Sequence, residues 1–155
     1  MIQILTGPIR SYKTTSLMYW AYARTDCGGV LSPDVGGLRR LYHVRNKTSI
    51  PWQKPEATVD TDLVIGRFVF DDIAFQTAMT WLDQDATDQE VKYFILDEIG
   101  PLELKGRGWD PWLQRSLHSL QSKETILVVR DFLLEQVIRY YGLQEPQILH
   151  EIGEL

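Results

Sequence analysis

Apolar and polar positions divide the chain into two alternating kinds of segment. Short apolar, β-branched runs predict buried strands, and longer segments with apolar residues about every 3.6 positions predict helices. Strands are expected at residues 2–6, 63–70, 91–96, 125–129 and 147–152, with a further strand and a hairpin-like excursion within 28–45. Helices are expected at residues 13–24, 72–84, 110–122 and 131–141. This alternation predicts an α/β domain in which helices cover both faces of a mainly parallel sheet.

Turn and cap residues mark where these segments end. Gly7 and Pro8 stop the first strand, Asp71 can cap a helix, and Asp110 precedes a first-turn proline as a second expected cap. Residues 46–61 are polar, contain two prolines and show no period. We therefore expect a long surface loop there, a feature that is often functional or mobile in a compact domain.

The length of 155 residues fits one domain, residues 1–155, and composition narrows the class of protein. Apolar residues make up 44% and charged residues 24%, which is typical of a globular fold. The net charge of -5 gives the whole chain no attraction to nucleic acid or to an anionic membrane. The attraction for a phosphate group would therefore have to come from residues at the site itself.

Cysteine and histidine usage argues against several metal sites and against a disulfide. Cys27 is the only cysteine, so an internal disulfide and the multi-cysteine zinc patterns are excluded, and the three histidines lie far apart. The N-terminus lacks a basic start before its short apolar run, and no apolar stretch approaches the ~20 residues that span a bilayer. We expect a cytoplasmic protein with no membrane segment.

A candidate phosphate-binding loop follows the first predicted strand. It comprises Gly7, Pro8, Ile9, Arg10, Ser11, Tyr12, Lys13, Thr14 and Thr15, which is the pattern G-x-x-x-x-G-K-[ST] with tyrosine in place of the second glycine. In that pattern loop amides surround the phosphates, the lysine contacts β and γ oxygens, and the Ser/Thr hydroxyl binds Mg²⁺. Residues 1–25 contain three basic residues and no acid, which suits an anion. The alternative is a solvated basic helix start.

A second motif places two carboxylates at the end of an apolar strand, in the sequence Phe94-Ile95-Leu96-Asp97-Glu98. Ligands of open α/β sheets bind beyond the carboxyl ends of the strands, so these acids would emerge beside the loop if the two strands are neighbours. Asp97 suits Mg²⁺ coordination, and Glu98 suits deprotonating a water in line with the γ-phosphate. The alternative is two acids in an exposed turn.

Other residues are weaker candidates, and each has an ordinary structural explanation. Three arginines could stabilise transition-state charge or lie on the surface: Arg67, Arg107 and Arg130. Trp52 and Trp109 could stack on a base or pack in the core. Asp34 could line the mouth of the site or form a turn.

With both motifs identified, the chain resembles the small stand-alone P-loop nucleoside-triphosphatase family, whose vertebrate form is called cancer-related nucleoside-triphosphatase. The most specific segment is residues 96–105, LDEIGPLELK, and similar segments occur at 32–37, 66–69 and 128–130, in matching order. The resemblance implies a three-layer, RecA-like P-loop fold and Mg²⁺-dependent hydrolysis of nucleoside triphosphates with loose base preference. It also implies that Lys13 and Thr14 act as phosphate and metal residues, with Asp97 and Glu98 as Walker B residues.

Tyr12 departs from the family, which has glycine at this position. A bulky residue at positive φ costs about 1–3 kcal/mol, so we expect either a strained loop that is partly collapsed without ligand or a different path in which Tyr12 is unstrained and its ring turns outward. The main hypothesis is a hydrolase that cleaves the β–γ bond of ATP or GTP. Two alternatives are a non-hydrolytic nucleotide-binding module and a small phosphotransferase.

Overall fold

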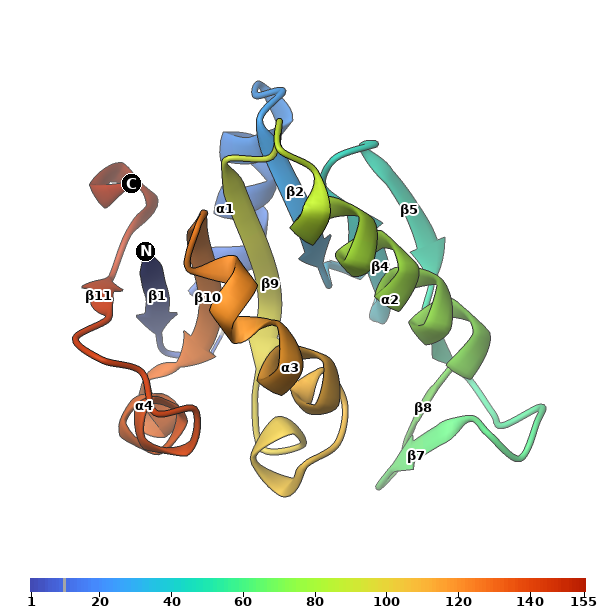
Figure 1. The fold of residues 1–155 in the computed structure, drawn as a ribbon. Coiled ribbons are helices and arrows are strands. Elements are labelled where there is room, and N and C mark those ends of the chain that lie inside the picture. The colour runs from blue at the N-terminus through green and yellow to red at the C-terminus, as the bar shows by residue number, and fades with distance from the viewer. Residues whose placement is uncertain (10) are drawn as a thin grey trace.

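The computed structural model describes residues 1–9 and 11–155, and Arg10 lies outside the described residues. In the described part, helices cover both faces of a central sheet (Figure 1). All the pairings among the central strands are parallel, and antiparallel strands extend the sheet on one side. The expected α/β class with a mainly parallel sheet is therefore confirmed.

In the described part of the chain, five strands form the parallel part of the sheet. In order across the sheet they are β11 (Gln147–Leu149), β1 (Ile2–Gly7), β10 (Glu124–Arg130), β9 (Tyr93–Ile99) and β2 (Cys27–Leu31). Because β10 lies between β1 and β9, the strands of the two motifs are not neighbours, so the condition under which the two acids were expected beside the loop is not met in this form. The carboxyl ends of all these strands still lie at one edge of the sheet, because the strands are parallel.

Shorter antiparallel strands follow beside β2. They are β4 (Leu38–His43), with β3 (Asp34–Val35) and β5 (Thr48–Pro51) paired to it, and a separate sheet of β6 (Gln53–Lys54), β8 (Phe68–Phe70) and β7 (Leu63–Ile65). In Figure 1 the β7–β8 hairpin extends from the body of the molecule.

Three sequence predictions need correction in this region and beyond it. The expected loop at 46–61 contains β5 and β6, and β5 shows no apolar period because it is a largely exposed edge strand. The single strand expected at 63–70 is a hairpin, because Gly66 adopts a positive φ of 59° and turns the chain. Asp110 is the first residue of its helix, and Trp109 occupies the cap position assigned to it.

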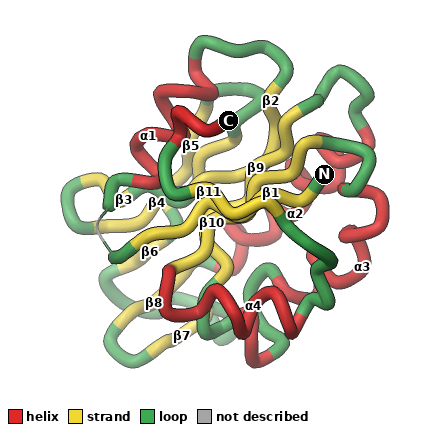
Figure 2. The backbone as a smooth tube through the Cα atoms, turned by 90° about the vertical axis from the view of Figure 1, so that its left-hand side faces the viewer, coloured by secondary structure: helices red, strands yellow, loops and turns green. Residues whose placement is uncertain are grey.

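The helices divide between the two faces of the sheet. One face carries α1 (Lys13–Tyr22) and the 3₁₀-helix η3 (Ile152–Glu154), and the other carries α2 (Asp72–Thr87), α3 (Asp110–Leu120) and α4 (Leu134–Tyr140). Figure 2 shows α1 and α4 on opposite sides of the strands. No helix of the described residues is long and apolar enough to cross a membrane.

Alternating side chains of the strands build the two halves of the core. On β9, Phe94 and Leu96 pack with α2 and α3, whereas Ile95 between them packs with α1. All three side chains are fully buried. Burial on both faces explains why the central strands read as continuous apolar runs in the sequence.

A buried polar contact joins α2 to the sheet. The Asp85 carboxylate accepts a hydrogen bond from the backbone N–H of Gly29 at 2.7 Å and lies 3.0 Å from Nε2 of His43, whose ring stacks on Trp81. Gly29 has a φ of 101°, and a Cβ there would lie 1.9 Å from the carbonyl oxygen of Ile95, so only glycine fits this approach of β2 to β9.

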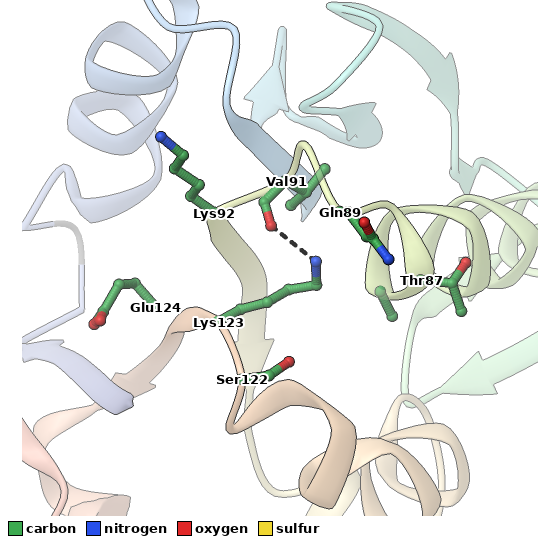
Figure 3. Close-up of a pocket in the computed structure, with 8 residues that line it drawn as sticks. Thr87, Gln89, Val91, Lys92, Ser122, Lys123 and Glu124 are labelled. Atoms are coloured by element: carbon green, nitrogen blue, oxygen red, sulfur yellow. Dashed lines mark hydrogen bonds between the residues drawn. The ribbon is translucent and has the colours of Figure 1, made fainter.

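A second polar contact between α2 and the sheet lies at the amino ends of β9 and β10. This edge of the sheet is opposite the edge that carries the two motifs. Figure 3 shows Lys123 beside a cavity of about 460 Å³, with its amine donating to the carbonyl oxygen of Val91 at 2.8 Å. The amine also donates to the carbonyl oxygen of Asp88, the C-cap residue of α2, at 2.6 Å. Burial lowers the pKa of Lys123. These contacts fasten the end of α2 to the start of β10.

Replacing Asp85 with alanine should reduce the free energy of unfolding by about 3 kcal/mol, because it leaves the Gly29 N–H and the His43 ring buried without their shared partner. Chemical denaturation measures this change. The matched control is Gln84→Ala at an exposed position of the same helix, which should change stability by less than about 0.5 kcal/mol. An equal effect of the two substitutions would contradict the anchoring role of Asp85.

Candidate functional site

A cleft of about 540 Å³ lies at the carboxyl ends of the parallel strands. It is lined by Ile9, Ser11, Tyr12, Lys13, Thr14, Thr15, Ser32, Pro33, Asp34, Arg39, Glu98 and Arg130. The lining residues come from the segments that follow β1 and β2, from β4, and from the ends of β9 and β10. This edge is where open α/β sheets bind their ligands, and the volume is within the range of small-molecule sites.

Lys13 begins α1 and bends back over the loop that precedes it. Its amine donates to the carbonyl oxygens of Gly7 at 3.2 Å and Pro8 at 3.0 Å, and lies 2.9 Å from the hydroxyl of Ser11. The first turn of α1 holds no acidic residue, so the ammonium group depends on loop oxygens for its partners. An anion at the helix start would compete with these carbonyls for the lysine.

Tyr12 caps the N-terminus of α1 in a left-handed conformation, with φ of 61° and ψ of 23°. Its ring is 76% exposed, and its side chain makes no capping hydrogen bond. The structure agrees with neither expectation in full: the backbone has the positive φ that a glycine would adopt freely, so Tyr12 is strained, and yet its ring turns outward. The strain is already present before any ligand binds.

Thr14 and Asp97 meet directly, although 83 positions separate them in the sequence. The threonine hydroxyl donates to Oδ2 of Asp97 at 2.7 Å, and the backbone N–H of Ser32 donates to the same oxygen at 3.1 Å. The Ser32 hydroxyl lies 3.1 Å from the carbonyl oxygen of Asp97. Ser32 follows β2, the neighbour of β9, so the sheet places its backbone beside the acid.

The oxygens of Thr14 and Asp97 suit a hard divalent cation such as Mg²⁺. Asp97 is fully buried, and its Oδ1 has no hydrogen-bond partner among the described residues. Mg²⁺ prefers oxygen ligands, and it commonly takes one or two from the protein while water and phosphate supply the rest. No cluster of three or more His, Cys, Asp or Glu side chains able to hold a metal occurs in residues 1–9 and 11–155. The residues present therefore fit a cation shared with a phosphate ligand.

Glu98 faces the cleft beside Asp97, and Nε of Arg130 lies 2.8 Å from its Oε1. The pairing of β9 with β10 shifts register at Val128 and Val129, so Glu98 has no partner in the ladder. Burial raises the pKa of Glu98 above its ordinary value, and the Asp97 charge adds to this effect. Nearby cations oppose the rise: Arg130, Arg39 and Lys13.

The turn after Glu98 is held by a second, buried acid. Glu103 accepts hydrogen bonds from the backbone N–H groups of Gly100 at 2.9 Å and Trp109 at 3.1 Å. Glu103 is in the short 3₁₀-helix η1 (Glu103–Lys105) and is 5% exposed. Burial raises the pKa of Glu103 to about 7, despite the two N–H groups that favour the carboxylate.

The structure brings most of the predicted site residues together. The loop residues from Ser11 to Thr15, together with Ile9, Asp34, Glu98 and Arg130, line the cleft, and Asp97 lies beneath it. Asp34 also accepts from the backbone N–H of Gly37, so it both lines the cleft and forms a turn. Gly7 and Pro8 take part through their carbonyl oxygens. Arg10, a predicted loop residue, lies outside the described residues.

Four weaker candidates do not line this cleft. Trp109 is buried and packs with Trp52 and Phe75, so the two tryptophans act as core residues. Arg67 lies at the β7–β8 turn, over the ring of Phe68. Arg107 is likewise not among the cleft residues in the described part of the chain.

Three cleft residues were absent from the sequence-based set of site residues, namely Ser32, Pro33 beside it, and Arg39. Ser32 directly follows a β-prone run, and residues after strands were the signal that revealed Asp97 and Glu98. Arg39 gives no such signal, because its place depends on how the β3–β4 hairpin folds over the cleft.

No protein-family profile matches the sequence, and no curated protein matches it in sequence. Solved structures, in contrast, match almost the whole chain. The crystal structure of THEP1 from the hyperthermophile Aquifex aeolicus is 17% identical, with a TM-score of 0.74 over 99% of this chain and 91% of that one. This chain has the fold of the small P-loop nucleoside triphosphatases.

The solution structure of a human cancer-related nucleoside triphosphatase is also similar, at 19% identity and a TM-score of 0.64 over 99% of this chain and 89% of that one. The P-loop NTPase fold that the sequence resemblance implies is thus confirmed. Identities this low carry the fold alone, so the activity of this chain has to be argued from its own residues.

Replacing Tyr12 with glycine should raise the free energy of unfolding by about 1 kcal/mol, because glycine removes the cost of positive φ in the ligand-free protein. Because the same strain exists before binding, triphosphate affinity should change by less than about threefold. Denaturant unfolding and calorimetric titration measure the two quantities. A tenfold gain in affinity at unchanged stability would instead mean that ligand binding imposes the strain.

Replacing Glu103 with glutamine should remove a pH dependence of stability. Because the pKa of Glu103 is raised in the folded state, folding favours the protonated carboxyl. Its contribution to the free energy of unfolding is therefore fully present below about pH 4.5 and is lost as the pH rises to about 7. Relative to Glu103→Gln, the parent should lose up to about 3 kcal/mol of unfolding free energy between pH 4.5 and 8. Parallel denaturation curves across this range would contradict the raised pKa.

Proposed function

We propose that this protein is a Mg²⁺-dependent nucleoside triphosphatase that hydrolyses the β–γ bond of ATP and GTP. The observation that carries the proposal is the 2.7 Å contact between Thr14 and Asp97, with Glu98 next to them at the cleft. A loop hydroxyl, a buried carboxylate and a second carboxylate at one strand end are the protein groups that hydrolysis of a metal-bound triphosphate requires. The P-loop NTPase fold supports the same assignment.

Lys13 and the start of α1 would bind the phosphates. The lysine exchanges its contacts with the Gly7 and Pro8 carbonyl oxygens for β- and γ-phosphate oxygens, and the N–H groups of the first helical turn face the same charge. Thr14 and Asp97 would hold Mg²⁺, which supplies neutralisation of phosphate charge when bound.

Glu98 acts as the general base in this proposal. It takes a proton from a water molecule while the water oxygen forms a bond to the γ-phosphorus and the bond from phosphorus to the bridging oxygen breaks. The products are inorganic phosphate and the nucleoside diphosphate. Arg130 orients the Glu98 carboxylate through their 2.8 Å ion pair, and burial raises the pKa of Glu98, which makes it a better proton acceptor.

Phosphate release from ATP and GTP, with and without Mg²⁺, tests the proposal. Release that requires the metal supports it, and EDTA should abolish it. Binding of triphosphate without release would instead assign the protein as a nucleotide-binding module. Release only in the presence of an added acceptor that becomes phosphorylated would assign it as a phosphotransferase.

Glu98→Gln should lower turnover by roughly 10²–10⁴ while leaving triphosphate affinity intact, because the amide keeps the shape of the carboxyl and cannot take a proton.

Lys13→Ala should instead weaken triphosphate binding by roughly tenfold or more. Glu135→Gln, at an exposed acid on α4, is the matched control and should change neither. Calorimetric titration with a non-hydrolysable analogue and phosphate release separate the two effects. Unchanged turnover in Glu98→Gln would remove Glu98 from the mechanism.

A further inference from the structure

Arg39 lines the cleft from β4, which β10, β9 and β2 separate from β1, the strand before the phosphate-binding loop. It is part of β4 and pairs with Asp34 of β3, so a hairpin carries its side chain to the cleft. The backbone is fixed at this point, because the N–H of Arg39 donates to Oε1 of Gln53 at 3.0 Å and its carbonyl oxygen accepts from Trp52 at 3.2 Å. The guanidinium group therefore extends from a rigid base.

A chain of hydrogen bonds connects Arg39 to the expected metal-binding pair. Its Nη1 donates to the carbonyl oxygen of Ser32 at 2.9 Å, and the N–H of Ser32 donates to Asp97, which also accepts from Thr14. This single contact uses one of the five N–H donors of a guanidinium group. The contact orients the group and leaves most of its donors available to a ligand in the cleft.

The other arginine that lines the cleft already forms an ion pair with an acidic side chain. Arg130 is ion-paired with Glu98 at 2.8 Å, whereas Arg39 forms no ion pair with any carboxylate of residues 1–9 and 11–155. An arginine that is held in place by a neutral carbonyl oxygen and forms no ion pair keeps its charge available to an anionic ligand. Its fork of donors matches the oxygens of a phosphate group.

We propose that Arg39 binds the terminal phosphate of the triphosphate and stabilises the negative charge on its oxygens during transfer to water. The proposal rests on the triphosphatase function above and adds a residue that acts on the phosphate from the β3–β4 hairpin. Lys13 approaches the phosphates from the loop and Arg39 from the hairpin, so the terminal phosphate lies between two cations of the same chain. No arginine from a partner protein is needed for this role.

The neighbouring Arg40 provides a matched control. It lies one residue further along the same strand, and its guanidinium group contacts Ser49 of β5 instead of the cleft. Arg40→Ala removes the same charge from the same strand without touching the site. Arg39→Lys keeps the positive charge and removes the fork of donors.

Three measurements on the full chain test the proposal: phosphate release, affinity for a non-hydrolysable triphosphate, and affinity for the diphosphate. Arg39→Ala should lower turnover about 10³-fold and weaken triphosphate affinity roughly tenfold, while diphosphate affinity stays within about twofold of the parent. Arg39→Lys should recover part of the triphosphate affinity but little of the turnover. Arg40→Ala should match the parent in all three.

An equal loss of diphosphate and triphosphate affinity in Arg39→Ala would overturn the proposal, because it would mean that Arg39 only supports the Ser32 segment. Parental turnover in Arg39→Ala would overturn it as well. If thermal unfolding shows that Arg39→Ala does not fold, the Arg39→Lys variant provides the test. Turnover equal to that of the parent in Arg39→Lys would then overturn the proposal. A parent that binds no triphosphate would instead refute the proposed function itself, which separates the two failures.

Discussion

The hydrogen bond between Thr14 and Asp97 is the contact on which the candidate site depends. It joins the start of α1 to the carboxyl end of β9 across an intervening strand, and it positions the acid that Ser32 also contacts. Such a contact forms only if the parallel strands are in register, because a shift would separate the loop from the acid. The buried contacts that fix this register, among them the close approach of Gly29 to Ile95, therefore support the site from a distance.

Local electrostatics at this edge of the sheet differ from those of the whole chain. The protein carries a net charge of -5, yet Lys13, Arg39 and Arg130 surround Glu98 at the cleft. Burial raises the pKa of Glu98 and of Glu103 behind it, so both acids hold their protons more tightly than an exposed glutamate. Solvent screens the negative charges that are spread over the surface, whereas these three cations lie at the cleft itself, where they oppose part of the rise in the pKa of Glu98.

The ammonium group of Lys13 finds its hydrogen-bond partners within the preceding loop in the ligand-free structure. Lys13 takes its partners from the Gly7 and Pro8 carbonyl oxygens, and Tyr12 holds the left-handed conformation that starts the helix. The helix start is thus already formed, and under the proposed function the main change on phosphate binding is the transfer of one lysine from carbonyl oxygens to phosphate oxygens. Tyr12, which is largely exposed, lines the cleft beside this lysine.

The sequence alone determined the central strands, the long helices and the two motifs, because these depend on local patterns: apolar runs, helical periodicity, and residues next to strand ends. Prediction from the sequence failed for features that no local residue pattern indicates. Thr48–Pro51 is an edge strand defined by its partner, and the position of β10 between β1 and β9 is a choice among strand orders that sequence does not encode locally. Tertiary structure alone decided that Ser32 and Arg39 belong to the cleft, because a hairpin and a neighbouring strand bring them there from outside both motifs.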